Sequence, residues 1–189
     1  MVTVIAAALN VLLFGAQASS AELSGWTGLL STFTLLLLIP GLGGSWEEPG
    51  WRGYALPCLQ TARSALFASL ILGAVWALWH LPLYLTGAVP WSDIVFVIVW
   101  TIVYTWLFNN GEGSVLICML LHNMNNVISG SFFAQMFSGA DSVSQDWLRT
   151  VLWGAVAMVL VVLYGPEHLS RKYNKQEEPL VATQHERVR

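Results

Sequence analysis

Charged residues are what this sequence of 189 amino acids lacks most. Only 10% of its residues are Asp, Glu, Lys or Arg, whereas 56% are hydrophobic. A soluble domain carries about 25% charged residues, so this composition excludes an ordinary soluble fold and predicts a membrane protein with several spans. Five of the eight basic residues lie after residue 165 and no basic patch forms elsewhere, so we expect no nucleic-acid partner.

Cysteine is nearly absent as well. Cys58 and Cys118 each stand alone in apolar surroundings, and they form no CxxC pair. The sequence therefore predicts no disulfide framework, and its cysteines do not indicate whether the protein lies in an oxidising or a reducing compartment.

Hydrophobic residues are instead abundant and gathered into runs. These runs predict an all-α fold: a polytopic transmembrane helical bundle of about six spans with a buried polar site. We divide the chain into an N-terminal transmembrane helix and loop (1–24), a core (25–165) and a polar, disordered cytoplasmic tail (166–189). The six apolar runs are residues 2–18, 25–44, 64–86, 91–108, 113–135 and 147–165.

The two ends of the chain predict the orientation in the membrane. Ala16-Gln17-Ala18 resembles a signal-peptidase site, but no positive residue precedes the first run, so we favour a first span and leave a cleaved signal open. Arg171, Lys172 and Lys175 place the tail in the cytoplasm. Six spans then place the N-terminus there too, with Arg149 as the exception at an outer end. We expect an integral protein of a bacterial cell membrane.

Three polar islands interrupt the apolar runs. Ionisable groups at membrane depth are costly, so they mark candidate functional sites. The islands lie 11 to 17 residues from a predicted inner turn near Arg63 or Gly111, or about 16–25 Å along a helix, and we expect them to share one layer of the bundle. They are Glu47, Glu48 and Arg52, then His80, then His122 and Asn126.

The first island follows a predicted break in the second apolar run. Pro40 and the glycines at 41, 43 and 44 disrupt a helix there. Ser45 and Glu48 then have the spacing of a capping box, and Pro49 fits the first turn of a new helix.

The residue types in the islands suit hydrolysis of an amide. Glu48 and Arg52 are four residues apart and can pair, which leaves Glu47, about 100° further round the helix, free to move a proton between water and a leaving amine. A histidine and an amide can donate hydrogen bonds to an oxyanion. Alternatively, Glu47, His80 and His122 form a zinc ligand set. No HExxH is present, so zinc and a metal-free site both remain open.

Each island also has a structural explanation: a capped ion pair, a core histidine, and hydrogen bonds between helices. We interpret the tryptophans, Trp76 and Trp79 among them, as packing or interface residues. The joint pattern favours a functional site because nearly all the charged and imidazole groups inside the spans fall in these islands.

With the islands in this order, the sequence resembles the CPBP intramembrane peptidases, the CAAX proteases and bacteriocin-processing enzymes also called the Abi family. The motifs EExxxR, aromatic-xxxH and HxxxN or HxxxD match residues 47–52, 76–80 and 122–126. The resemblance covers about residues 30–165. It departs in two respects: Trp76 stands where the second motif usually begins with Phe, and many members have eight spans.

The resemblance implies a membrane-embedded endopeptidase, sometimes described as a metallopeptidase. In its glutamate-based mechanism one glutamate and one histidine activate water, while a second histidine and an asparagine bind the oxyanion. By position these are Glu47, His80, His122 and Asn126, with Glu48 and Arg52 in support.

We therefore expect an intramembrane endopeptidase that hydrolyses a membrane-associated protein or peptide within the lipid bilayer. The alternative is a non-catalytic scaffold or bacteriocin-immunity protein that uses the same polar cluster to bind a partner. A third hypothesis, a proton or ion transporter, would use the carboxylates as a relay. The sequence leaves the substrate and the oligomeric state open.

Overall fold

A computed structural model describes residues 1–19 and 25–171, and all elements in these residues are helical. The predicted all-α fold is thus confirmed. The elements are α1 (Val2–Phe14), α2 (Trp26–Leu38), the 3₁₀ turn η1 (Gly44–Glu47), α3 (Glu48–Gly50), the π-helical turn η2 (Trp51–Ala55), α4 (Leu56–Gln60), α5 (Ala65–Trp79), α6 (Leu81–Leu85), α7 (Asp93–Asn110), α8 (Val115–Asn125), the π-helical η3 (Asn126–Phe132), the 3₁₀ turn η4 (Phe133–Gln135) and α9 (Gly139–Tyr164).

The apolar runs correspond to helices of two lengths. Three helical stretches in the described residues are long and apolar enough to cross a membrane: α7, α8 with its continuation to Gln135, and α9. Three shorter apolar helices, α1, α2 and α5, accompany them. The run at residues 64–86 is two helices, because α5 ends at Trp79 and α6 begins after His80.

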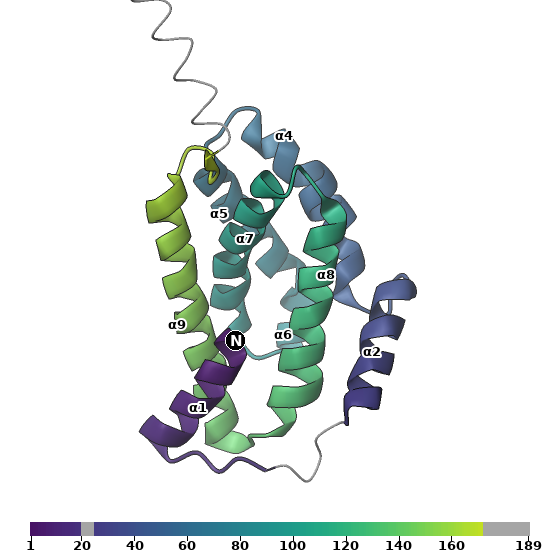
Figure 1. The fold of residues 1–189 in the computed structure, drawn as a ribbon, viewed down its shortest axis with the longest axis vertical. Helices are drawn as coiled ribbons and strands as arrows, with labels where there is room; N and C mark the ends of the chain where they lie inside the picture. The colour runs from purple at the N-terminus through teal and green to yellow at the C-terminus, as the bar shows by residue number, and fades with distance from the viewer. Residues whose placement is uncertain (20–24, 172–189) are drawn as a thin grey trace, which may run out of the picture.

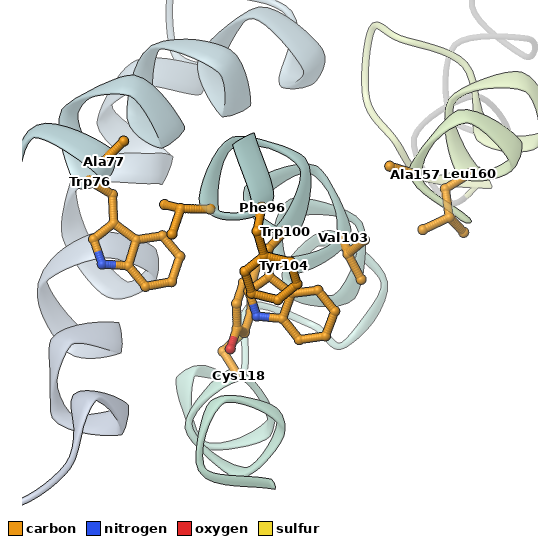
Figure 2. Close-up of a cluster of buried hydrophobic side chains, with 10 residues drawn as sticks. Trp76, Ala77, Phe96, Trp100, Val103, Tyr104, Cys118, Ala157 and Leu160 are labelled. Atoms are coloured by element: carbon orange, nitrogen blue, oxygen red, sulfur yellow. The ribbon is translucent and has the colours of Figure 1, made fainter. Parts of the chain in front are cut away.

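The helix α7 lies centrally and packs against α5 and α9, with α1 along α9 and α2 beside α8 (Figure 1). Gly73 allows α5 to approach α7, since an added Cβ there would lie 2.9 Å from the Ile98 Cα. Figure 2 shows side chains from α5, α7, α8 and α9 meeting in one apolar cluster. Its buried members are Trp76, Ala77, Phe96, Val97, Trp100, Val103, Tyr104, Cys118, Ala157 and Leu160.

The last helix begins earlier than the sixth apolar run, at Gly139 instead of residue 147. Its polar first turns pack on the first helix, where the fully buried Asn10 donates a hydrogen bond to the Asp141 carbonyl oxygen (2.8 Å). The Ser144 hydroxyl donates to the Asn10 side-chain oxygen (2.6 Å). The first helix itself ends at Phe14, with Gly15 in the left-handed conformation at φ 67°, four residues before the end of the predicted span.

The segment that follows α9 packs against the bundle. Asn109 and Asn110 donate side-chain hydrogen bonds to the carbonyl oxygens of His168 (2.8 Å) and Leu169 (2.9 Å). Leu169 is fully buried. The sequence placed the start of a disordered tail at residue 166, whereas hydrogen bonds hold residues 166–169 against the bundle. The two asparagines bind the last two of their carbonyl oxygens, and the backbone N–H groups of Ala65 and Leu66 bind the first two. Residues 172–189 lie outside the described part of the chain.

Candidate active site

The predicted break precedes the first polar island. The second helix ends at Leu38, and η1 begins at Gly44. Pro49 lies in the first turn of α3, as predicted. The predicted capping box is wrong, because the Ser45 hydroxyl donates to the Leu36 carbonyl oxygen (3.3 Å) and the Glu48 side chain turns into the bundle interior.

A buried ion pair joins Glu48 and Arg52, both with no exposed surface. The guanidinium Nη1 lies 3.2 Å from the carboxylate across the π-helical turn η2. The guanidinium carbon lies 4.3 Å from the centre of the Trp76 ring and 4.1 Å from that of Tyr104. These two aromatic faces stabilise the cation and replace part of its hydration.

Glu48 also reaches the third island. Its Oε1 lies 2.7 Å from Nδ1 of His122 on α8. One carboxylate therefore bridges a guanidinium from the first island and an imidazole from the third. The i, i+4 pairing with Arg52 confirms the sequence prediction, but the contact with His122 did not follow from spacing.

Glu47 has different partners, as its position further round the helix predicted. Its Oε2 accepts hydrogen bonds from the indole nitrogens of Trp76 (2.7 Å) and Trp51 (3.3 Å). The side chain is half-buried. The two neighbouring carboxylates thus face separate environments, one an ion-pair cluster and the other a pair of neutral donors.

His80 lies at the corner between α5 and α6. Its Nδ1 is 3.5 Å from Oδ2 of Asp93, the first residue of α7. The same carboxylate oxygen accepts a hydrogen bond from the Tyr84 hydroxyl at 3.3 Å. An acidic group therefore faces the ring of the second-island histidine.

Trp76 is the residue around which all three islands gather. Its ring centre lies 5.7 Å from that of His80 and 5.6 Å from that of His122. Since it also contacts Arg52 and Glu47, the islands occupy one neighbourhood, as the depth argument predicted. The interpretation of Trp76 as a packing residue was incomplete.

Gly44 packs closely against His122 and Asn126. A Cβ added at Gly44 would lie 2.7 Å from the His122 Nε2 and 3.5 Å from the Asn126 amide nitrogen. Both nitrogens therefore lie next to the bare backbone of the turn that carries the first island. Any side chain larger than that of glycine would force the His122 ring to shift.

The positions of these side chains also show how they could or could not bind a metal ion. Within the described ranges, no group of three or more His, Cys, Asp and Glu side chains is placed to hold a metal ion. Glu47 binds indole donors, His80 lies against Asp93 and His122 binds Glu48. Each of these three candidate ligands therefore contacts a different partner, and their role as zinc ligands stays a prediction.

Sequence reasoning missed several contributors to this cluster. Tyr104 and Thr101 come from α7, where they lie in an apolar run with no polar motif, and the Arg52 Nη2 lies 3.5 Å from the Thr101 hydroxyl. Asp93 could have been found from the sequence, because it is an acidic residue at the edge of a predicted span. Tyr104 could not, because burial against a guanidinium depends on helix packing.

The fold and the site define a class: a helical protein with apolar helices long enough to cross a membrane and a buried cluster of glutamate, arginine and histidine. Residues 26–128, more than half of the chain, match the type II CAAX prenyl endopeptidase Rce1-like family. The chain belongs to this family, and the resemblance drawn from its three motifs is confirmed.

A sequence comparison with a curated relative supports the same family. The chain is 29% identical over 134 residues to CAAX prenyl protease 2 of Methanococcus maripaludis. The match takes in 63% of this chain and 49% of that protein, so the chain spans about half the length of the curated relative that it matches.

Proposed function

We propose that this protein is an intramembrane endopeptidase that cleaves a membrane-associated protein or peptide. One observation carries the proposal: Glu47, His80 and His122 come from three separate helical segments and all contact the buried Trp76. Membership of the Rce1-like family supports the same reaction class. A packing role alone does not explain why an apolar bundle assembles these groups in one place.

In this proposal Glu47 is the general base and then the general acid. It takes a proton from water, whose oxygen bonds to the carbonyl carbon of the substrate. The carbonyl oxygen becomes an oxyanion. Glu47 then returns the proton to the amide nitrogen as the carbon–nitrogen bond breaks. His80 hydrogen-bonds the attacking water, and Asp93 lies 3.5 Å from its other ring nitrogen.

His122 and Asn126 bind the oxyanion beside Gly44. Nδ1 of His122 lies 2.7 Å from the Glu48 carboxylate, and this contact orients the ring so that Nε2 is the nitrogen that faces the oxyanion. Arg52 holds Glu48 in place from the other side. Fixed donors in a buried setting stabilise developing negative charge strongly.

The membrane setting completes the proposal. In this proposal the cluster lies within the bilayer and both termini lie in the cytoplasm. The family description names prenyl endopeptidases, so a peptide with a lipidated cysteine near its C-terminus is the first substrate to test. Unmodified membrane peptides form the second substrate class.

The experiment compares purified wild-type protein with Glu47→Gln on prenylated and unmodified peptides, with and without a chelator. We expect cleavage by wild type and a loss of at least about 100-fold in the variant, the size typical of removing a positioned acid–base group. Glu112→Gln, on an exposed turn between α7 and α8, is the matched control and retains activity. Mass spectrometry of the products gives the cleaved bond.

A second outcome would favour the scaffold hypothesis. In that case Glu47→Gln and wild type behave alike in every cleavage assay, and both still support the biological activity of the protein in cells. Proton flux in liposomes that depends on Glu47 would instead indicate a transporter.

A further inference from the structure

The hydrogen bonds to the Glu47 side chain in the described residues all reach one of its two carboxylate oxygens. Its Oε2 accepts hydrogen bonds from two indole N–H groups, Trp76 at 2.7 Å and Trp51 at 3.3 Å. Its Oε1 has no hydrogen-bond partner within residues 1–19 and 25–171. A carboxylate is symmetric, so donors on one oxygen distinguish it from the other.

The stronger donor is rigid. Trp76 is only 2% exposed, and its ring packs against the Arg52 guanidinium, Tyr104 and both histidines of the site. Figure 2 shows its indole nitrogen turned away from the rings of α7. Rotation of this side chain would break all of these contacts, so the N–H direction is fixed by the core.

The two donors belong to different elements. Trp51 is on η2, four residues after Glu47, and packs edge-on against Trp79 at 6.3 Å between ring centres. Trp76 is on α5, 29 residues away. The Glu47 carboxylate therefore accepts one hydrogen bond from the helical segment that follows it and one from α5.

We propose that Trp76, assisted by Trp51, is a positioning residue for Glu47. The indole N–H groups hold Oε2 and present Oε1 as the oxygen that exchanges a proton with water. This inference rests on the proposed peptidase function. Hydrogen bonds to an ionised acceptor are short and about twice as strong as neutral ones, so the pair can fix the carboxylate plane. Phe, the usual residue at the start of this motif, has no N–H to donate.

The first test reads the hydrogen bond without any assay of activity. Indole N–H resonances of ¹⁵N-labelled protein are recorded in detergent, and the Trp76 signal is assigned by its loss in Trp76→Phe. We expect this signal at low field in wild type and a shift upfield in Glu47→Gln, since a neutral amide is a weaker acceptor than a carboxylate. The Trp106 indole, buried without a hydrogen-bond partner, is expected to stay in place.

The second test is kinetic. In Trp76→Phe we expect kcat to fall about 10- to 100-fold, the size of one lost hydrogen bond to a charged group, with KM nearly unchanged. Trp51→Phe, with the longer bond, has a smaller effect on kcat. Trp106→Phe is the control, because it removes the same atoms from a tryptophan on α7 that packs on Tyr164. It loses the same side-chain volume, and we expect it to retain the wild-type kcat.

The outcomes separate this inference from the proposed function. A Trp76 resonance that does not respond to Glu47→Gln overturns the inference, whether or not the protein cleaves peptides. A wild-type kcat in Trp76→Phe also overturns it. The wild-type protein could instead cleave no peptide while the Trp76 resonance still responds to Glu47→Gln. In that case the peptidase function is wrong, and the hydrogen bond from Trp76 to Glu47 remains a property of the fold alone.

Discussion

Glu48 shares one fully buried carboxylate between a guanidinium and an imidazole. Removing Arg52 would leave the Glu48 carboxylate without its buried counter-charge, which typically costs about 3–5 kcal/mol. Glu47 next to it contacts only neutral donors and has one oxygen without a partner in the described residues. Two identical side chains, adjacent in the chain, are therefore suited to different tasks: one to hold the site together and one to react.

The bare backbone at Gly44 leads to a prediction at the residue scale. In Gly44→Ala the new methyl group would lie 2.7 Å from the His122 Nε2 and 3.5 Å from the Asn126 amide nitrogen, so the His122 ring would have to shift. We expect kcat/KM for peptide cleavage to fall about 100-fold, as a displacement of about 1 Å in a site can cause, while the protein still folds.

Gly154→Ala is the matched control for that experiment. It lies in the middle of α9, and an added Cβ there meets nothing within 4 Å. Wild-type cleavage by Gly44→Ala would mean that the position of the His122 ring does not matter for oxyanion binding.

At the scale of elements, two π-helical turns adjoin the motifs. The turn η2 contains Arg52, and η3 starts at Asn126. A π-helical turn widens the helix and re-aims its side chains, and such turns are frequent at functional sites. Here they lie where the first and third islands face each other.

The contact between α5 and α7 supports a prediction about stability. In Gly73→Ala the Cβ would lie 2.9 Å from the Ile98 Cα, which is backbone and cannot move aside. We expect the two helices to separate and the unfolding free energy to fall by about 1–3 kcal/mol, the usual cost of overpacking. Thermal unfolding in detergent measures this as a lower Tm, with Gly154→Ala again as the control.

That change also tests how the site depends on its scaffold. Since α5 carries Trp76 and ends just before His80, and α7 carries Asp93, displacement of one helix against the other should lower peptide cleavage together with the Tm. An unchanged Tm in Gly73→Ala would contradict the close packing described for this pair.

At the scale of the whole molecule, the two native cysteines test the proposed orientation. Cys58 is exposed on α4 and Cys118 is fully buried. Arg63 follows α4, and the distribution of basic residues places this end of the bundle in the cytoplasm. We expect a membrane-impermeant maleimide to label Cys58 in inverted vesicles and not in intact cells.

Cys118 is the internal control, because a buried thiol stays unlabelled in both preparations. Cys58→Ser confirms that the signal comes from one residue. Labelling of Cys58 in intact cells would place α4 on the outer side and reverse the proposed orientation of both termini.

Much of this architecture could be predicted from the sequence alone. Long apolar runs determine helices, since a chain in lipid must satisfy its backbone polar groups within each segment. The break before Glu47, the pairing of Glu48 with Arg52 and the gathering of three polar islands also followed from local spacing. These features depend on residues close together in the chain or on the high cost of burying charge.

Only the tertiary structure decided which groups meet. Spacing placed Glu47 and Glu48 about 100° apart on a helix, but the packing of α5 and α8 against that helix determined that Glu48 faces His122 and Glu47 faces Trp76. The docking of residues 166–170 onto α7 was equally hidden, because its hydrogen bonds join residues 59 positions apart. Such contacts depend on the geometry of whole helices, which no local pattern of residues contains.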